Sequence, residues 1–161
     1  MCSSDLVSKD EFRSALGRFA SGVTVVTTKS KDDKPSGITV SAFSSVSLEP
    51  PLILVCIDKR ASVHDLLEEG HHFAVNVLAE NQEVISRRFA SKDPDRFAGI
   101  GYTEGVEGDP LLTDAIACVE CRVAHKYPGG DHTIVVGEVE RISVSDGKPL
   151  AYFRGGYVQL A

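Results

Sequence analysis

Short runs of β-branched residues, separated by turn residues, dominate the hydrophobic pattern of this chain. Helical spacing is clearest near the N-terminus, where apolar residues recur at Phe12, Ala15, Leu16 and Phe19. Ser8 and Glu11 have the spacing of a capping box, in which each side chain binds the backbone of the other residue. We therefore predict an amphipathic helix over residues 9–20, ended by Ser21-Gly22.

The rest of the chain is mostly predicted strand, at residues 23–28, 38–45, 52–57, 72–78, 117–127, 133–144 and 157–160. Turn residues at 31–35 and 128–131 join neighbouring strands. One short helix is predicted after a Ser62 cap and is closed by Gly70, and another follows an Asn81 cap. Residues 91–114 are rich in Gly, Pro and Asp and are predicted to be mostly irregular.

Strands outnumber helices and do not alternate regularly with them. This pattern favours a mainly β fold, an antiparallel barrel with flanking helices, over a doubly wound parallel sheet. No repeat and no linker divides residues 1–161, so we expect a single domain.

Charge and composition exclude several classes of protein. The net charge of −6 with scattered Lys and Arg argues against nucleic-acid binding. No apolar run is long enough to span a membrane, and the N-terminus lacks the pattern of a signal peptide. We therefore expect a soluble, cytoplasmic protein.

The cysteines are Cys2, Cys56, Cys118 and Cys121, of which the last two have C-x-x-C spacing. A structural zinc site needs a second ligand pair, and none matches. A redox motif needs the pair at the start of a helix, whereas this pair lies within a predicted strand. We predict reduced thiols that fill strand positions, and no metal.

The candidate binding chemistry is concentrated in GITVSAFSSVSLEPPLILVCID, residues 37–58. Five hydroxyl residues precede its double proline: Thr39, Ser41, Ser44, Ser45 and Ser47. Hydroxyls and loop amides at a strand end can bind a phosphate or the polar edge of a ring. The G-x-G-x-x-x-G series at residues 99–105 is not the Rossmann dinucleotide fingerprint. We predict that an anionic or heteroaromatic ligand lies against residues 37–58.

Other candidates each allow a structural and a functional interpretation. His132 is either a surface residue at a loop end or a hydrogen-bond partner for a carboxamide or phosphate. Tyr157 either packs the last strand or stacks on a flat ring. Arg87 and Arg88 are either solvated or supply charge to a phosphate. No nucleophile stands beside a base, so any reaction depends on a cofactor.

An ordered series of segments resembles the flavin reductase-like family of FMN-binding split barrels, in particular the reductase components of two-component aromatic monooxygenases. The segments are FRSALGRFASGVTVVTT, residues 37–58, FAVNVL, RRFA, DRFAG, GDPLLTDAIACVEC, GDHTIVVGEV and FRGGYVQL. They cover nearly the whole chain, and the resemblance implies a Greek-key antiparallel split barrel.

The resemblance also implies site residues. The flavin contacts are expected at Thr39, Val40, Ser41, Ala42, Ser44, Ser45, Cys56, Ile57, Asp58 and Ser62, with Arg88 and Phe89 at the phosphate end. The nicotinamide side is expected at His132 and Tyr157, with Ser21 and Gly22 at its border. His64 stands where the family often has a small hydroxyl residue.

The implied activity is hydride transfer from NADH or NADPH to FMN or FAD, from nicotinamide C4 to flavin N5. Holding the two rings in contact would carry the reaction rather than acid–base residues. The reduced flavin would leave for a separate oxygenase, and the resemblance implies a homodimer. The alternative is a flavin carrier or sensor of the same fold. The preferred flavin, the preferred nicotinamide and the partner oxygenase stay open.

Overall fold

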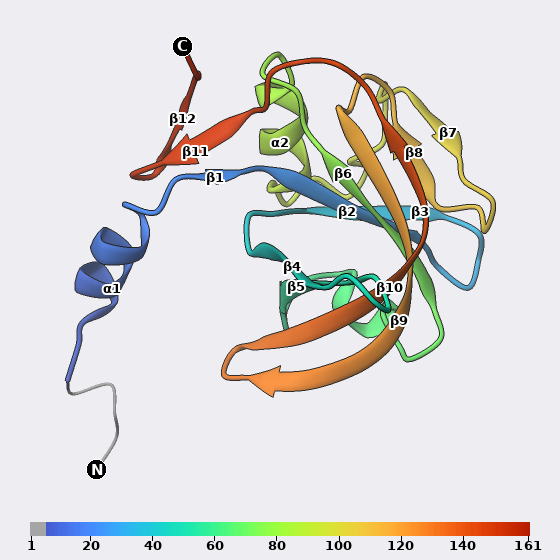
Figure 1. Cartoon of the computed structure of the whole chain (residues 1–161), viewed down its shortest axis with the longest axis horizontal. Helices are drawn as coiled ribbons and strands as arrows, with labels where there is room; N and C mark the ends of the chain where they lie inside the picture. The colour runs from blue at the N-terminus through green and yellow to red at the C-terminus, as the bar shows by residue number, and fades with distance from the viewer. Residues whose placement is uncertain (1–5) are drawn as a thin grey trace.

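A seven-stranded antiparallel sheet forms the body of the molecule in the computed structural model, which describes residues 6–161. Its strands are β2 (Thr24–Lys29), β3 (Pro35–Val40), β4 (Phe43–Ser47), β5 (Leu52–Asp58), β6 (His72–Val77), β9 (Ala117–Gly129) and β10 (His132–Val144). Their spatial order is β3-β2-β6-β9-β10-β5-β4. β3 and β4 lie at opposite edges of this order, yet they are consecutive in the chain. The sheet must therefore curl until its edges meet, which confirms the predicted barrel (Figure 1).

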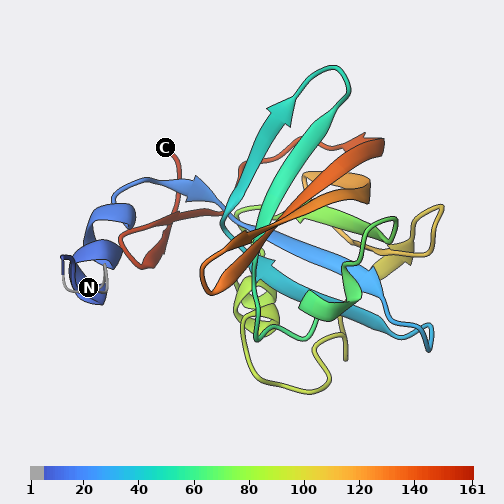
Figure 2. The ribbon, with the colours of Figure 1, turned by 90° about the horizontal axis from the view of Figure 1, so that it is seen from below.

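Smaller elements surround the barrel. β1 (Ser21–Gly22), β11 (Ala151–Phe153) and β12 (Gly156–Val158) form a three-stranded sheet, and β7 (Tyr102–Glu104) pairs with β8 (Pro110–Leu112). The helices are α1 (Lys9–Leu16), α2 (Glu83–Phe89) and the 3-10 helix η2 (His64–Leu66). Figures 1 and 2 both show α1 standing apart from the barrel, beside the β11–β12 hairpin.

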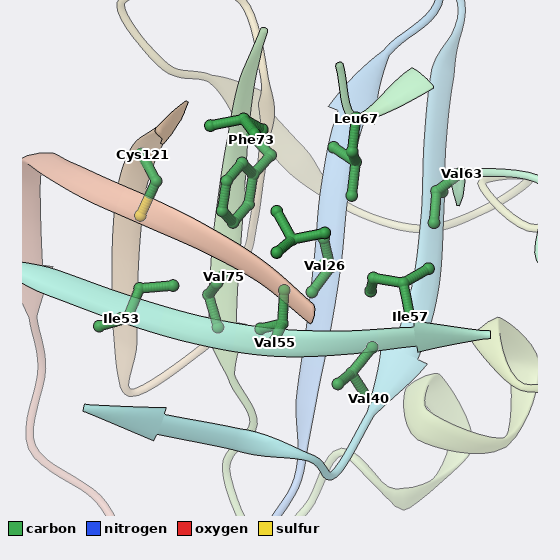
Figure 3. Packing of buried hydrophobic residues seen from close by; sticks show 12 residues of the cluster. Val26, Val40, Ile53, Val55, Ile57, Val63, Leu67, Phe73, Val75 and Cys121 are labelled. Atoms are coloured by element: carbon green, nitrogen blue, oxygen red, sulfur yellow. The ribbon is translucent and has the colours of Figure 1, made fainter. Parts of the chain in front are cut away.

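The main core lies inside the barrel, where β5 shows the period-two alternation of a strand with one buried face. Along β5, buried residues alternate with half-buried ones, so Ile53, Val55 and Ile57 point inward. They pack against Val26 of β2 and Phe73 of β6 (Figure 3). A second cluster lies between the barrel and α2 and contains Val23, Val25, Leu78, Phe89, Leu112 and Leu150.

The single strand predicted over residues 38–45 is wrong, because the chain bends at Ser41-Ala42 and divides it into β3 and β4. β3 pairs with β2, whereas β4 pairs with β5. The Cys56 amide donates to the Ala42 carbonyl at 3.0 Å, which fixes the bend against β5. Hydroxyl residues that looked like parts of one strand therefore lie on two strands and the bend between them.

The predicted helices are present but shorter or shifted. The capping box of Ser8 and Glu11 is confirmed, but α1 ends at Leu16 because Gly17 caps it. Ser62 does not cap a helix, since η2 begins at His64 without a side-chain cap. Asn81 is likewise not a cap: α2 follows Gln82, whose side chain instead binds Ala79 and Thr113.

The structure also differs from the sequence prediction in two places after residue 90. Residues 91–114 are mostly irregular as predicted but include the three-residue strands β7 and β8. The final strand is Gly156–Val158, and β11 before it has no counterpart in the sequence prediction. Such short strands carry too few residues to show a period, and their pairing partners define them.

Candidate functional site

A pocket of about 170 Å³ lies at the bend between β3 and β4. It is lined by Ile38, Thr39, Val40, Ser41 and Ala42, by Cys56, Ile57 and Asp58 of β5, and by His132 of β10. The strand register explains why His132 lies beside the β5 residues, because His132 pairs directly with Asp58 across β10 and β5. Cys56 and Asp58 are half-buried and alternate with the inward residues of β5. The structure thus brings together seven of the predicted flavin residues and His132.

A second pocket, of about 210 Å³, adjoins the first and is lined by Val23, Thr39, Ser41, Ser86, Ala90, Tyr152 and Tyr157. The two pockets share Thr39 and Ser41, so we treat them as one surface and call it the Thr39 groove. Neither pocket alone reaches the roughly 300 Å³ of a usual ligand site. Together they connect His132 at one end with Tyr157 at the other.

Tyr157 is held on three sides. Its hydroxyl lies 2.6 Å from the Ser86 Oγ atom of α2. The Arg87 guanidinium lies over its ring, 4.9 Å from the centroid, in cation–π geometry. Tyr152 packs edge-on at 5.3 Å between ring centroids. An aromatic ring held in this way presents a fixed wall to the Thr39 groove.

Carboxylates surround the His132 end of the groove. The His132 Nδ1 atom lies 2.7 Å from the Asp131 carboxylate, and this hydrogen bond lowers the pKa of Asp131. A carboxylate only accepts, so Nδ1 donates the hydrogen bond to Asp131. Hydrogen bonds from the Arg60 side chain and backbone hold the pKa of Asp58 well below its usual range. This end of the groove therefore offers an imidazole between two ionised carboxylates.

A third pocket, of about 410 Å³, continues along β3 from the groove, because Gly37 lines it and Ile38 lines the groove. Its lining is Lys34, Pro35, Ser36, Gly37, Ser62 and residues 92–97. Lys34, Lys92 and Arg96 bring positive charge, next to Asp93 and Asp95. Arg96 also donates to the Gly37 carbonyl at 2.9 Å, which attaches the 92–97 loop to β3.

The family model described as "Flavin reductase like domain" matches residues 16–161. The chain belongs to the flavin reductase-like family. The reductase subunit HsaB of a flavin-dependent monooxygenase from Mycobacterium tuberculosis is 43% identical over 149 residues, covering 91% of this chain and 79% of that one. An NADH-dependent flavin reductase from Rhodococcus sp is 43% identical over 152 residues, covering 92% of this chain and 84% of that one.

A solved structure of the same family has the same fold. It is the Streptomyces globisporus C-1027 NADH:FAD oxidoreductase SgcE6 in complex with NAD and FAD fragments. It matches with a TM-score of 0.91 and 36% identity over 100% of this chain and 96% of that one. The split-barrel fold expected from the resemblance is therefore confirmed.

Some of the residues expected from the family pattern lie outside the Thr39 groove. Ser62 lines the third pocket. Arg88 donates to the carbonyls of Arg96 at 2.8 Å and Asp95 at 3.0 Å, so it holds the loop that lines that pocket. Arg88 therefore holds the loop and does not line the pocket, whose lining cations are Lys34, Lys92 and Arg96.

Phe89 is fully buried, so its side chain faces none of these pockets, and its approach to the phosphate end stays a prediction. Its ring packs edge-on against Phe97 at 4.9 Å between centroids, and a Cβ built on Gly37 would lie 3.0 Å from it. Phe89 supports β3 from beneath the third pocket.

Four further predicted residues border the groove without lining it. Ser44 and Ser45 are exposed on β4, where the Ser44 hydroxyl donates to the Ser45 carbonyl. Ser21 and Gly22 form β1 and pair with Tyr152 and Ala151 of β11. The residue of this segment that lines the groove is Val23.

His64, which replaces the small hydroxyl residue common in the family, turns toward the barrel. Its Nε2 atom lies 2.7 Å from the Thr133 hydroxyl of β10, and its Nδ1 atom lies 2.8 Å from Asp65. It lines none of the three pockets described above. Its hydrogen bonds therefore attach η2 to the barrel.

The described cysteines are free thiols: Cys56 lines the groove, whereas Cys118 and Cys121 are buried. Burial raises the pKa of Cys118 and raises that of Cys121 to about 12. Cys2 lies outside the described residues. Within residues 6–161, no three His, Cys, Asp or Glu side chains converge as metal ligands, and no helix has the length and apolar content to cross a membrane.

Sequence reasoning did not name five residues that line the groove, namely Val23, Ile38, Ser86, Ala90 and Tyr152, of which Ser86 and Tyr152 carry hydroxyls. Ser86 lies in the same ISRRFA segment that drew attention to Arg87 and Arg88. The sequence signal for Ser86 is a small polar residue at a buried position of an amphipathic helix, which indicates a hydrogen bond but not the residue that it is made with.

Proposed function

We propose that the Thr39 groove binds a flavin beside a reduced nicotinamide and that this chain supplies reduced flavin to a partner oxygenase. Membership of the flavin reductase-like family supports flavin reduction. HsaB, a reductase subunit of a flavin-dependent monooxygenase, supports the partner oxygenase. The observation that carries the proposal is the groove itself, in which hydroxyl residues on the bend lie between His132 and Tyr157.

The lining of the groove fits a flat ring with a polar edge. Ser41 and Ala42 are exposed at the bend and line the groove, so the Ser41 hydroxyl is accessible to a ligand. Val23 and Cys56 supply apolar surface beside them. Apolar lining with a few placed polar groups is the usual composition of a cofactor pocket. When bound there, a flavin supplies the hydride acceptor of the reaction.

The third pocket suits the phosphate-bearing tail of the flavin. It continues from the groove along β3, and Lys34 and Lys92 line it. Arg88 and Arg96 fix its loop by binding carbonyls of residues 95, 96 and 37. Cations on a fixed loop can neutralise a phosphate without moving.

His132 and Tyr157 bind and orient the reduced nicotinamide in this proposal. The His132 Nδ1 atom is engaged by Asp131, which leaves Nε2 for the ligand, and the ring of Tyr157 forms a wall of the groove. No general acid or base is needed, because holding two rings in the reactive arrangement lowers the entropic part of the barrier. The chain's contribution is therefore binding, orientation and exclusion of water.

The protein is a homodimer in this proposal, and α1 supports it. No residue of α1 is buried against residues 6–161, and Phe12, Leu16 and Phe19 are 60%, 55% and 80% exposed. An isolated eight-residue helix is marginally stable in water, so α1 needs a surface to pack on. A second copy of the chain provides one.

Steady-state oxidation of NADH and NADPH, with and without added FMN or FAD, tests the proposal. We expect nicotinamide oxidation that depends on added or bound flavin. A protein that binds flavin and oxidises neither nicotinamide is a carrier or sensor, and that result overturns the reductase function.

A further inference from the structure

Ser86 connects the two sides of the Thr39 groove. It is fully buried on α2, and its carbonyl accepts a hydrogen bond from the Thr39 hydroxyl at 2.6 Å. Its own Oγ atom lies 2.6 Å from the Tyr157 hydroxyl. One residue therefore contacts both the flavin side and the Tyr157 wall of the groove.

Burial indicates which hydroxyl donates in the Ser86–Tyr157 pair. A buried hydroxyl hydrogen without an acceptor is costly, and such groups are almost always paired. Within residues 6–161, Tyr157 is the one hydrogen-bond partner of the Ser86 Oγ atom. The 2.6 Å contact fits either direction, and the burial of Ser86 favours Ser86 as the donor and the Tyr157 oxygen as the acceptor. The hydrogen of the half-buried Tyr157 is then left to point into the pocket that both residues line.

The groups around Tyr157 restrict the orientation of its side chain. The Arg87 guanidinium over its ring is itself held by Glu83, at 2.9 Å between Nε and Oε2. β12, which carries Tyr157, pairs with β11, and β11 pairs with β1, outside the main sheet. The Ser86 hydrogen bond is the side-chain hydrogen bond that joins this small sheet to α2.

We propose that Ser86 is a positioning residue that directs the Tyr157 hydroxyl hydrogen toward the reduced nicotinamide. Tyr157 then donates to the carboxamide oxygen, the neutral acceptor on the nicotinamide ring. This inference rests on the proposed function, since it needs a nicotinamide in the groove. It assigns Ser86 to recognition of the hydride donor, separate from flavin binding.

A double-mutant cycle tests the inference with Ser86→Ala, Tyr157→Phe and the double variant, measured as KM for NADH and KM for flavin. We expect Ser86→Ala to raise the KM for NADH about threefold and Tyr157→Phe about tenfold, the range of one neutral hydrogen bond. The KM for flavin should stay within about twofold. The double variant should match Tyr157→Phe alone, because both changes remove the same interaction.

Thr39→Val is the contrasting variant, because it removes the other hydrogen bond of Ser86 and leaves the Ser86 hydroxyl in place. It should act mainly on the KM for flavin. If Ser86→Ala does not fold, Ser86→Cys retains a weak donor and should give a smaller rise in the KM for NADH.

Effects of Ser86→Ala and Tyr157→Phe that multiply in the double variant would overturn the role of Ser86, as would an equal rise in both KM values. Wild-type turnover with either result leaves the proposed function standing. Absence of flavin-dependent turnover in the wild-type protein rejects the proposed function itself.

Discussion

His132 lies directly opposite Asp58 in the antiparallel pair of β10 and β5. The pairing continues to Glu138 opposite Leu52 without a register shift. Side chains directly opposite in such a pair share one face of the sheet, and a slip of one residue would move His132 to the other face. Register thus places a residue expected on the nicotinamide side beside one expected on the flavin side.

Replacing His132 with alanine should raise the KM for NADH about three- to tenfold and change flavin binding less, because one hydrogen-bonding group is lost. Steady-state kinetics and flavin titration measure the two effects. His125→Ala is the matched control, since His125 is exposed on β9 and lines no pocket described above. Equal losses in flavin and NADH affinity would contradict the role assigned to His132.

Alkylation should distinguish the cysteines of the folded protein. The thiolate is the reactive form, so burial and raised pKa values should protect Cys118 and Cys121 until the protein unfolds. Cys56 lines the groove and should react faster than either. Flavin at about ten times its Kd should slow the modification of Cys56 about tenfold. Peptide mass spectrometry gives each rate, and an unchanged Cys56 rate would place the flavin elsewhere.

Gly137→Ala should destabilise the fold by about 1–3 kcal/mol, because it overpacks the barrel core. An added Cβ would lie 2.6 Å from Cζ of Phe73 and 3.1 Å from Cβ of Cys121. Gly22→Ala is the control, since its Cβ would meet nothing within 4 Å, and it should change stability by less than about 0.5 kcal/mol. Urea unfolding measures both, and equal effects would contradict the close contact with Phe73.

Asp109 should make stability depend on pH. Burial, with Glu120 and Glu107 nearby, raises its pKa from 3.8 to about 7. Between pH 3.8 and about pH 7 the folded state binds more protons at Asp109 than the unfolded state does. The contribution of Asp109 to stability therefore falls as the pH rises through this range and levels off above about pH 7. Asp109→Asn should raise the free energy of unfolding by about 1–3 kcal/mol at pH 8 and flatten its dependence on pH in this range. Unfolding at several pH values tests it, with the exposed Glu69→Gln as control.

Phe19→Asp should convert the dimer to monomer if α1 and the turn after it pack on a second copy. A charge at an apolar interface is left buried and unpaired, so the dimer should weaken about 100-fold or more. Sedimentation equilibrium measures the assembly state. Val84→Asp, an exposed apolar position on α2, is the control and should leave assembly unchanged. A wild-type monomer would contradict the proposed dimer.

The strands that carry the core could be predicted because they are short runs of apolar and β-branched residues, alternating in burial on β5 and buried almost throughout on β2 and β6. Residues 23–28, 52–57 and 72–78 lie within one residue of the observed strands at both ends. The capping box of α1 was also readable, because Ser8 and Glu11 interact within one helical turn. The bend at Ser41-Ala42 was not, because it depends on which strand each half pairs with.

The sequence by itself determined the class of fold and pointed to residues 37–58 as the candidate binding segment, since apolar strand runs and clustered hydroxyl residues are local properties. Only the tertiary structure decided how the site is assembled. Strand register brought His132 to Asp58, and helix packing brought Ser86 to Thr39 and Tyr157. These contacts join residues far apart in the chain, and no periodicity encodes them. The packing of the barrel and α2 selects them, because it buries Ser86 and leaves Tyr157 at the edge of the groove.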